Sequence, residues 1–267
     1  LTIDGNGGNI WNGGTGTLTL AQGFTTPAND KGKITGLIDA INNSTGKIAF
    51  GGTVVLDDLT NNAGGTVELT GGMVAGSVGN NAASSTIELK ANTTFSGGTV
   101  NNGNAASVIK LNSNTLTLSN GTAVTVTNNG KIISNTAATI GNGIVAITGK
   151  ATINNGELPN VTVAAGKTLS LNGATLYGYL DNKGAVTLAG NLTVKGNYNQ
   201  TGAGMLTFGA NTFTLEGDWV RTSNVPSDVI YNTGKLVFTG GNAQNFTSGA
   251  SLKLYDIEIN KTLDTDQ

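Results

Sequence analysis

The regularly spaced acids are the first residues that could do chemistry. Glu68 and Glu88 hold equivalent positions in Thr-Val-Glu-Leu and Thr-Ile-Glu-Leu, 20 residues apart. If one turn of a repeating fold separates them, both carboxylates lie on one outer face, and such a pair can act as acid and base or nucleophile on a glycosidic bond. Lys90 and Lys110 are near enough to offset the charges, and we favour the interpretation of a solvated, neutralised surface pair.

A second candidate is an aromatic residue flanked by an acid and by the only arginine, in Asp218-Trp-Val-Arg221. An aromatic ring beside polar groups suits a sugar, so Trp219, Arg221 and Asp218 form a possible glycan patch. The simpler interpretation is that Trp219 occupies an apolar strand position, continuing the spacing from Phe213. The sequence favours this second interpretation.

The composition excludes most other chemistry. The chain has no histidine and no cysteine, so it has no Ser-His-Asp triad, thiol nucleophile or His- or Cys-ligated zinc. We therefore expect no enzyme activity, no catalytic residue and no cofactor. A net charge of −2 argues against nucleic-acid binding, and no apolar run is long enough for a membrane span.

Oxygen ligands for a metal are sparse. Asp57 and Asp58 are neighbours, and neighbouring residues of an extended chain point in opposite directions. The segment Asp4-Gly-Asn-Gly-Gly8 looks like part of a calcium loop but lacks its distal acid, and Asp264-Thr-Asp266 is a short acidic pair. We assign no metal site and allow an incidental calcium ion.

The elements that would position these residues are short strands. Apolar residues alternate with Thr, Ser, Lys or Glu in runs of about four, as in Thr115-Leu-Thr-Leu118, Ala185-Val-Thr-Leu188 and Asp256-Ile-Glu-Ile259. Each run therefore has one apolar face and one polar face directed to solvent. Gly and Asn separate the runs, and together with Thr they supply 116 of the 267 residues.

A longer period joins these strands into a stack. One series of apolar residues is spaced by 22, 23, 21 and 23, and another by 23, 21, 23 and 21. The first series is Ile87, Ile109, Ile132, Ile153 and Leu176, and the second is Leu169, Leu192, Phe213, Leu236 and Ile257. Such periods are typical of solenoids. We predict an all-β fold, a parallel β-helix of triangular section with roughly ten or more coils of about 21–23 residues, as a single domain over residues 1–267. The general preference for right-handed crossovers sets its expected hand.

The corners of the coils are expected at Asn-Gly steps, because both residues tolerate positive φ. Asn-Asn-Gly recurs at 101–103, 128–130 and 154–156. Stacked asparagines can hydrogen-bond along a corner as an amide ladder. The competing interpretation of Asn-Gly is a two-residue hairpin turn.

One segment has a different period. Ile34, Leu37, Ile38 and Ile41 follow the i, i+3, i+4, i+7 pattern of a helix. We predict a short helix near residues 30–42, inside a segment 24–45 that is either an insertion between early coils or an N-terminal cap. The strand-like Leu18 and Leu20 precede it and favour the insertion.

The whole chain resembles bacterial β-helical surface proteins. Asn-Gly-rich alternations such as Thr115–Val126 carry the resemblance, as do Gly217-Asp-Trp219, Gly234–Gly241, Gln244–Gly249 and Leu254–Asn260. The chain looks like autotransporter passengers and giant adhesins similar to filamentous haemagglutinin. The resemblance implies a non-catalytic structural or adhesion module in the extracellular space or on the bacterial cell surface.

The expected partners follow from that resemblance. They are a host or neighbouring cell surface, glycans, or copies of the chain stacked end to end. The alternative functions are a self-assembling subunit of an extracellular filament, sheath or S-layer and, less favoured, a polysaccharide-binding or glycan-cleaving β-helix.

Overall fold

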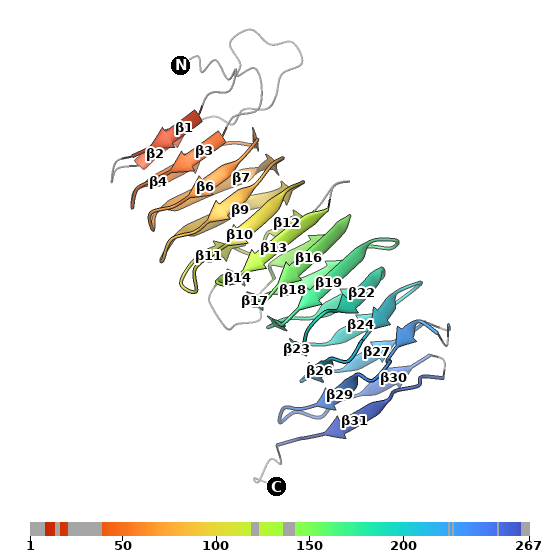
Figure 1. Ribbon diagram of the computed structural model, residues 1–267. Helices are drawn as coiled ribbons and strands as arrows, with labels where there is room; N and C mark the ends of the chain where they lie inside the picture. The colour runs from red at the N-terminus through yellow and green to blue at the C-terminus, as the bar shows by residue number, and fades with distance from the viewer. Residues whose placement is uncertain are drawn as a thin grey trace.

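The computed structural model describes residues 9–13, 17–20, 39–118, 123–135, 142–223, 225, 227–249 and 251–262. Within these ranges every regular element is a strand, 31 in number, and every strand pairing is parallel. Parallel pairing excludes Asn-Gly hairpins there. The strands stack into a β-solenoid of about ten turns with about 21 residues each, drawn as a rod from β1 and β2 to β31 in Figure 1.

Three columns of strands form three faces of the rod. The first face contains β1 (Asn9–Asn12), β3 (Asp39–Asn42), β6 (Leu59–Asn61), β8 (Val78–Asn80), β10 (Thr99–Asn102), β13 (Val124–Asn128), β16 (Lys150–Asn154), β19 (Thr168–Asn172), β22 (Ala185–Leu188), β25 (Met205–Thr207) and β28 (Val229–Ile230). The second contains β2 (Thr17–Leu20), β4 (Lys47–Phe50), β11 (Val108–Lys110), β14 (Lys131–Ile133), β17 (Glu157–Leu158), β20 (Ala174–Leu176), β23 (Leu192–Val194), β26 (Thr212–Leu215), β29 (Lys235–Phe238) and β31 (Asp256–Ile259).

The third face contains β5 (Val54–Leu56), β12 (Thr115–Leu118), β15 (Ile144–Ile147), β18 (Asn160–Val163), β21 (Leu180–Asn182), β24 (Tyr198–Gln200), β27 (Trp219–Arg221) and β30 (Phe246–Ser248). Two longer strands, β7 (Thr66–Val74) and β9 (Thr86–Phe95), continue from the second face into the third. The predicted triangular arrangement follows from these three columns.

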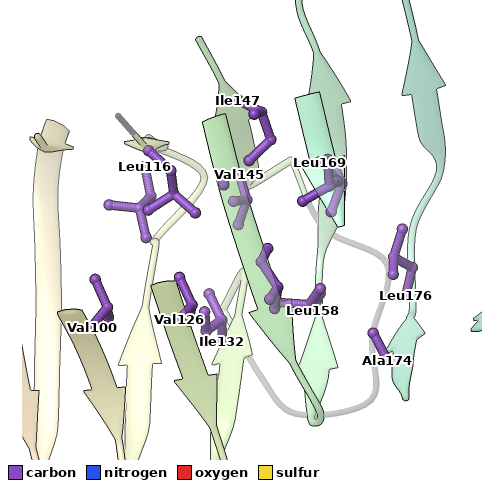
Figure 2. Close-up of a cluster of buried hydrophobic side chains, with 14 of the residues drawn as sticks. Val100, Leu116, Val126, Ile132, Val145, Ile147, Leu158, Leu169, Ala174 and Leu176 are labelled. Carbon is purple, nitrogen blue, oxygen red and sulfur yellow. The ribbon is translucent and has the colours of Figure 1, made fainter. Parts of the chain in front are cut away.

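Alternation places one residue in two inside the rod. In β12 the side chains of Leu116 and Leu118 are buried, whereas Thr115 and Thr117 face outward. Buried residues of successive coils lie above one another, and Figure 2 shows this for Val100 and Val126 and for Leu116 and Val145. One coil covers the apolar side chains of the next, so each coil depends on its neighbours for burial.

The structure corrects part of the predicted register. Four members of the second series are in register as predicted: Leu192, Phe213, Leu236 and Ile257. The first member, Leu169, is not. It lies on the first face opposite Val186, and Leu192 pairs instead with Ala174.

Ile153 is also wrongly placed by a constant period. It pairs with Val126 on the first face and does not continue the column of Ile109 and Ile132. The reason is that coil length varies. Lys131 pairs with Glu157, 26 residues on, and Glu157 pairs with Thr175, only 18 further on.

The helix predicted near residues 30–42 is contradicted at its C-terminal end. Residues 39–42 form β3, in which Ala40 and Asn42 point inward and Ile41 is half-buried. Pairing of β3 with both β1 and β6 outweighs the local helical period there. Residues 24–38 of the predicted segment 24–45 lie outside the described residues, and residues 43–45 follow β3 without regular structure.

Candidate functional site

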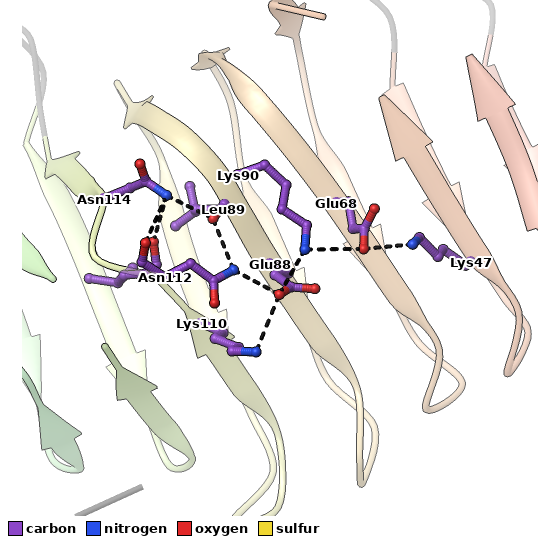
Figure 3. Close-up of polar contacts among 9 residues, drawn as sticks. Lys47, Glu68, Glu88, Leu89, Lys90, Lys110, Asn112 and Asn114 are labelled. Atoms are coloured by element: carbon purple, nitrogen blue, oxygen red, sulfur yellow. Dashed lines mark hydrogen bonds and ion pairs between the residues drawn. The ribbon is translucent and has the colours of Figure 1, made fainter. Parts of the chain in front are cut away.

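The two regularly spaced glutamates lie in a row of alternating charges on the second face. Glu68 and Glu88 are partners in register. Glu68 lies between Lys47 at 2.6 Å and Lys90 at 3.5 Å, and Glu88 between Lys90 at 3.0 Å and Lys110 at 3.3 Å. Figure 3 shows the resulting chain of five side chains across successive strands. The lysines neutralise the two acids as expected, but the side chains of Glu68 and Glu88 are only 17% and 15% exposed and so less solvated than predicted.

The environment of Glu88 keeps it ionised. Burial raises its pKa, but hydrogen bonds from Asn112, Lys90 and Lys110 outweigh this and lower the pKa to about 2. The Nδ2 of Asn112 donates to Oε1 of Glu88 at 2.7 Å. A general acid in glycoside hydrolysis needs a raised pKa, so Glu88 is poorly suited to that role. The arrangement instead ties together neighbouring coils.

A ladder of buried asparagines closes the inner corner of the first face. Each Nδ2 donates to Oδ1 of the asparagine one coil further on, at 3.1, 3.1, 2.8 and 2.8 Å. The members are Asn42, Asn61, Asn80, Asn102 and Asn128, and all five are buried. Each Nδ2 also donates to main-chain carbonyls at the turn, as Asn80 does to Ser85 and Val108. The predicted corner ladder is confirmed at Asn102 and Asn128 and extends further than the Asn-Asn-Gly motif indicated.

A second, exposed ladder lies outside the same corner. Asn62, Asn81 and Asn101 each donate from Nδ2 to Oδ1 of the previous member, beginning at Asn43, at 3.0, 3.1 and 2.8 Å. The exposed ladder donates toward the N-terminus, whereas the buried one donates toward the C-terminus. The sequence signal for both is the Asn-Asn pair that recurs at the end of the first-face strands.

The proposed glycan patch does not form a surface. Trp219 and Arg221 are both 0% exposed and point into the rod from β27. Trp219 packs on Tyr198, with ring centroids 4.6 Å apart, and stacks on Phe246 at 5.8 Å. Alternation along β27 explains the correction, because positions 219 and 221 share the inward face. Of the three residues, only Asp218 remains on the outside of the rod, where it accepts a hydrogen bond from the main-chain amide of Asn245 at 2.8 Å.

Arg221 instead lies at the centre of a buried polar network. Its Nη2 is 2.7 Å from Oδ1 of Asp228, and its Nε donates to the same oxygen at 2.8 Å. It also donates to Oγ of Ser248 at 2.8 Å and to the carbonyl of Val225 at 2.6 Å. Asp228 was missed from the sequence, because it lies in an irregular segment seven residues after Arg221. The network therefore holds the last described coils together.

The inward column continues below Arg221. Gln200 pairs with Arg221, and Asn182 pairs with Gln200. The hydroxyl of the buried Tyr198 donates to Oε1 of Gln200 at 2.8 Å, and burial raises the pKa of Tyr198 far above its ordinary value. Tyr198 therefore stays a neutral hydrogen-bond donor.

Apolar side chains of the last described coil point inward but are exposed, although they pair with buried residues of the preceding coil. Ile257 and Ile259 pair with the buried Leu236 and Phe238, and Phe246 pairs with Trp219. Ile259 is nevertheless 74% exposed and Phe246 47%. With Phe238 and Lys261 they line a hollow of about 300 Å³ at this end of the stack.

Of the acids considered for metal binding, Asp58 accepts a main-chain hydrogen bond, and the candidates near the two termini lie outside the described residues. Asp39 and Asp58 accept hydrogen bonds from the amides of Asp58 and Ser77 in the next coil. Burial and the charges of Asp58 and Asp39 raise the pKa of Asp57. Within the described residues, no group of three or more acids forms a metal site. The calcium-like segment 4–8 and the pair 264–266 are not described.

Comparisons with protein-family models, with curated proteins and with solved structures give no significant match. In the part of the chain that the structure describes, there is no helix long and apolar enough to cross a membrane.

Proposed function

We propose that the chain is a non-catalytic structural and adhesion module of an extracellular bacterial surface protein. The observation that carries the proposal is the stack itself. Three columns of parallel strands run from β1 to β31, and the Asn42–Asn128 ladder and the Lys47–Lys110 charge row brace successive coils. A rod of this kind holds a binding surface at a distance from its anchor and is held together without disulfides.

Retention of coated beads tests the adhesion role. Beads carrying the folded chain are expected to remain on epithelial or bacterial cell layers under flow, and beads carrying heat-unfolded chain are expected to wash off. Equal wash-off of both preparations from every cell layer would count against an adhesive role and leave only the structural one.

A second candidate function is self-assembly into an extracellular filament, and the apolar C-terminal end favours it. Phe246, Ile257 and Ile259 need a covering surface because they are turned inward yet exposed. The N-terminal strands β1 and β2 of another copy would continue the same parallel columns, giving a head-to-tail contact that does not close.

Electron microscopy and sedimentation test the assembly. The unmodified chain at high concentration is expected to give rods several times the length of one copy. The double variant Phe246→Lys, Ile259→Lys is expected to give single rods, because it places charges on the end surface. Thr247→Lys, on the outer side of β30, is the matched control and should assemble normally. Single rods from the unmodified chain at every concentration would remove this candidate.

A further inference from the structure

The corner between the second and third faces in the C-terminal half is built on a column of glycines. Gly178, Gly196 and Gly217 follow one another in successive coils. A Cβ on Gly178 would overlap Oδ1 of Asn160, and one on Gly196 would come within 2.7 Å of the Gly178 backbone. The coils approach so closely here that only glycine fits. The glycines therefore let successive coils pack closely at this corner.

Two rows of side chains flank the glycine column. Tyr179, Asn197 and Asp218 directly precede Leu180, Tyr198 and Trp219, which are in register. These three residues therefore lie one above another along one side of the column.

On the other side are Tyr177, Lys195 and Glu216, which directly follow the aligned Leu176, Val194 and Leu215. Lys195 lies 5.0 Å from the centre of the Tyr177 ring and 3.9 Å from Glu216. This second row is thus satisfied within itself.

The first row borders a surface hollow of about 280 Å³. Its lining residues are Asn160, Gly178, Tyr179, Gly196, Asn197 and Asn199. Asn160 is committed to the fold, because its Oδ1 accepts from the Tyr179 amide at 3.1 Å and its Nδ2 donates to the Gly143 carbonyl at 3.0 Å. The hollow is therefore preformed by hydrogen bonds beneath it.

Other polar groups of the hollow are available to a ligand. Oδ1 of Asn197 accepts from the Asp218 amide at 2.9 Å. Among the described residues, the Nδ2 of Asn197 and the side-chain amide of Asn199 make no hydrogen bond within the chain. Tyr179 is half-buried, and burial followed by the charge of Asp181 raises its pKa. The hollow thus offers a half-buried aromatic ring with a neutral hydroxyl and two side-chain amides.

We propose that the hollow bounded by Tyr179, Asn197 and Asn199 binds a neutral saccharide, which names the ligand class of the adhesion role proposed above and rests on it. The ring gives an apolar surface for the C–H face of a sugar, and amides both donate to and accept from hydroxyls. Asp181 and Asp218 border the site and disfavour acidic sugars. The site replaces the patch predicted around Trp219, one to two coils away on the same corner.

Saturation-transfer NMR and calorimetry with maltotetraose, cellotetraose, mannotetraose and chitotetraose test the proposal, with sialyllactose as the acidic comparison. At least one neutral tetrasaccharide is expected to bind. Tyr179→Ala should weaken that binding by about tenfold or more through loss of the ring, and Tyr179→Phe should retain most of it. Asn199→Ala should cause a smaller loss.

Tyr177→Ala is the matched control, because Tyr177 lies at the same corner on the satisfied side of Gly178. It should bind like the unmodified chain. No binding of any neutral tetrasaccharide, or equal losses in Tyr177→Ala and Tyr179→Ala, would overturn the site. If the unmodified chain still retains beads on cells in that case, the adhesion role stands and only the saccharide assignment fails.

Discussion

The buried asparagine ladder and the buried Arg221 network occupy comparable positions, since each lies at the inward end of a strand, yet they satisfy their polar groups differently. An amide carries both donors and an acceptor. A copy of Asn61 one coil on is therefore a complete partner, as the bond from Asn61 to Asn80 shows. A guanidinium has only donors, and a copy of it would repel. Arg221 depends on residues of other types, above all Asp228.

Because of this difference, the asparagine ladder can be extended by adding repeats, whereas the Arg221 network cannot. The ladder can add a coil by repeating one residue, and its two ends need only small adjustments. At one end Oδ1 of Asn42 accepts from Ser44, and at the other Nδ2 of Asn128 donates to the carbonyl of Glu157. The Arg221 network occurs once and depends on an irregular segment. Its side chains therefore distinguish the C-terminal coils from the others.

The largest effect is expected from breaking the single network. Asp228→Ala leaves a buried guanidinium without its counter-charge and should lower the free energy of unfolding by about 3–5 kcal/mol. Denaturant titration followed by circular dichroism measures the change. Lys195→Met, which removes a half-exposed ion pair with Glu216, is the control and should cost less than about 1 kcal/mol. Similar losses in the two variants would contradict the importance given to the network.

A double variant sharpens the same point. Arg221→Met together with Asp228→Leu removes both charges and fills much of the same volume. Replacement of a buried ion pair by apolar residues is often neutral or stabilising, so the double variant should recover most of the stability lost in Asp228→Ala. A double variant as unstable as the single one would show that the hydrogen bonds to Ser248 and Val225 matter more than the charge pair.

The next effect concerns the repeated ladder. Asn80→Ala removes the donor to Ser85, Val108 and Asn102. The carbonyl of Ser85 still accepts from the Val108 amide, and Oδ1 of Asn102 still accepts from Ser107. The cost is therefore that of the lost buried hydrogen bonds, about 1–3 kcal/mol. Asn61 retains its bond to the carbonyl of Gly65, which limits the damage. The loss in denaturant titrations should be smaller than in Asp228→Ala, and a larger loss would reverse the ranking of the two regions.

The charge row on the second face predicts a pH dependence. The pKa of Glu88 is about 2, against an ordinary value of 4.5. A carboxyl with a lowered folded-state pKa stabilises the fold above its unfolded pKa, and this contribution is lost as the pH falls from about 4.5 toward 2. Stability of the unmodified chain should therefore decline in this window, and Glu88→Gln should show a shallower decline. Identical pH profiles would show that Glu88 contributes nothing to acid stability.

The sequence predicted the repeated parts of the molecule and missed the parts that occur once. Alternation and a period near 21 residues identify the solenoid, because every coil repeats the same burial requirement. The place of Ile153 was wrong because the coils differ in length. The inward orientation of Trp219 follows from the strand alternation that the sequence favoured. The role of Asp228 instead depends on an irregular segment that no period describes. The hollow at Tyr179 is lined by residues of three successive coils, which only the register brings together.

The smallest effect is expected at the exposed ladder. Asn81 is the sequence neighbour of Asn80, and it makes the same kind of amide bonds, to Asn62 and from Asn101. Water replaces those bonds when the side chain is removed, so Asn81→Ala should change the free energy of unfolding by no more than about 0.5 kcal/mol. Because Asn80 and Asn81 share chemistry and differ in burial, the gap between their alanine variants measures what burial adds to an amide ladder. Equal losses would mean that the strength of the ladder comes from cooperativity along the stack rather than from exclusion of water.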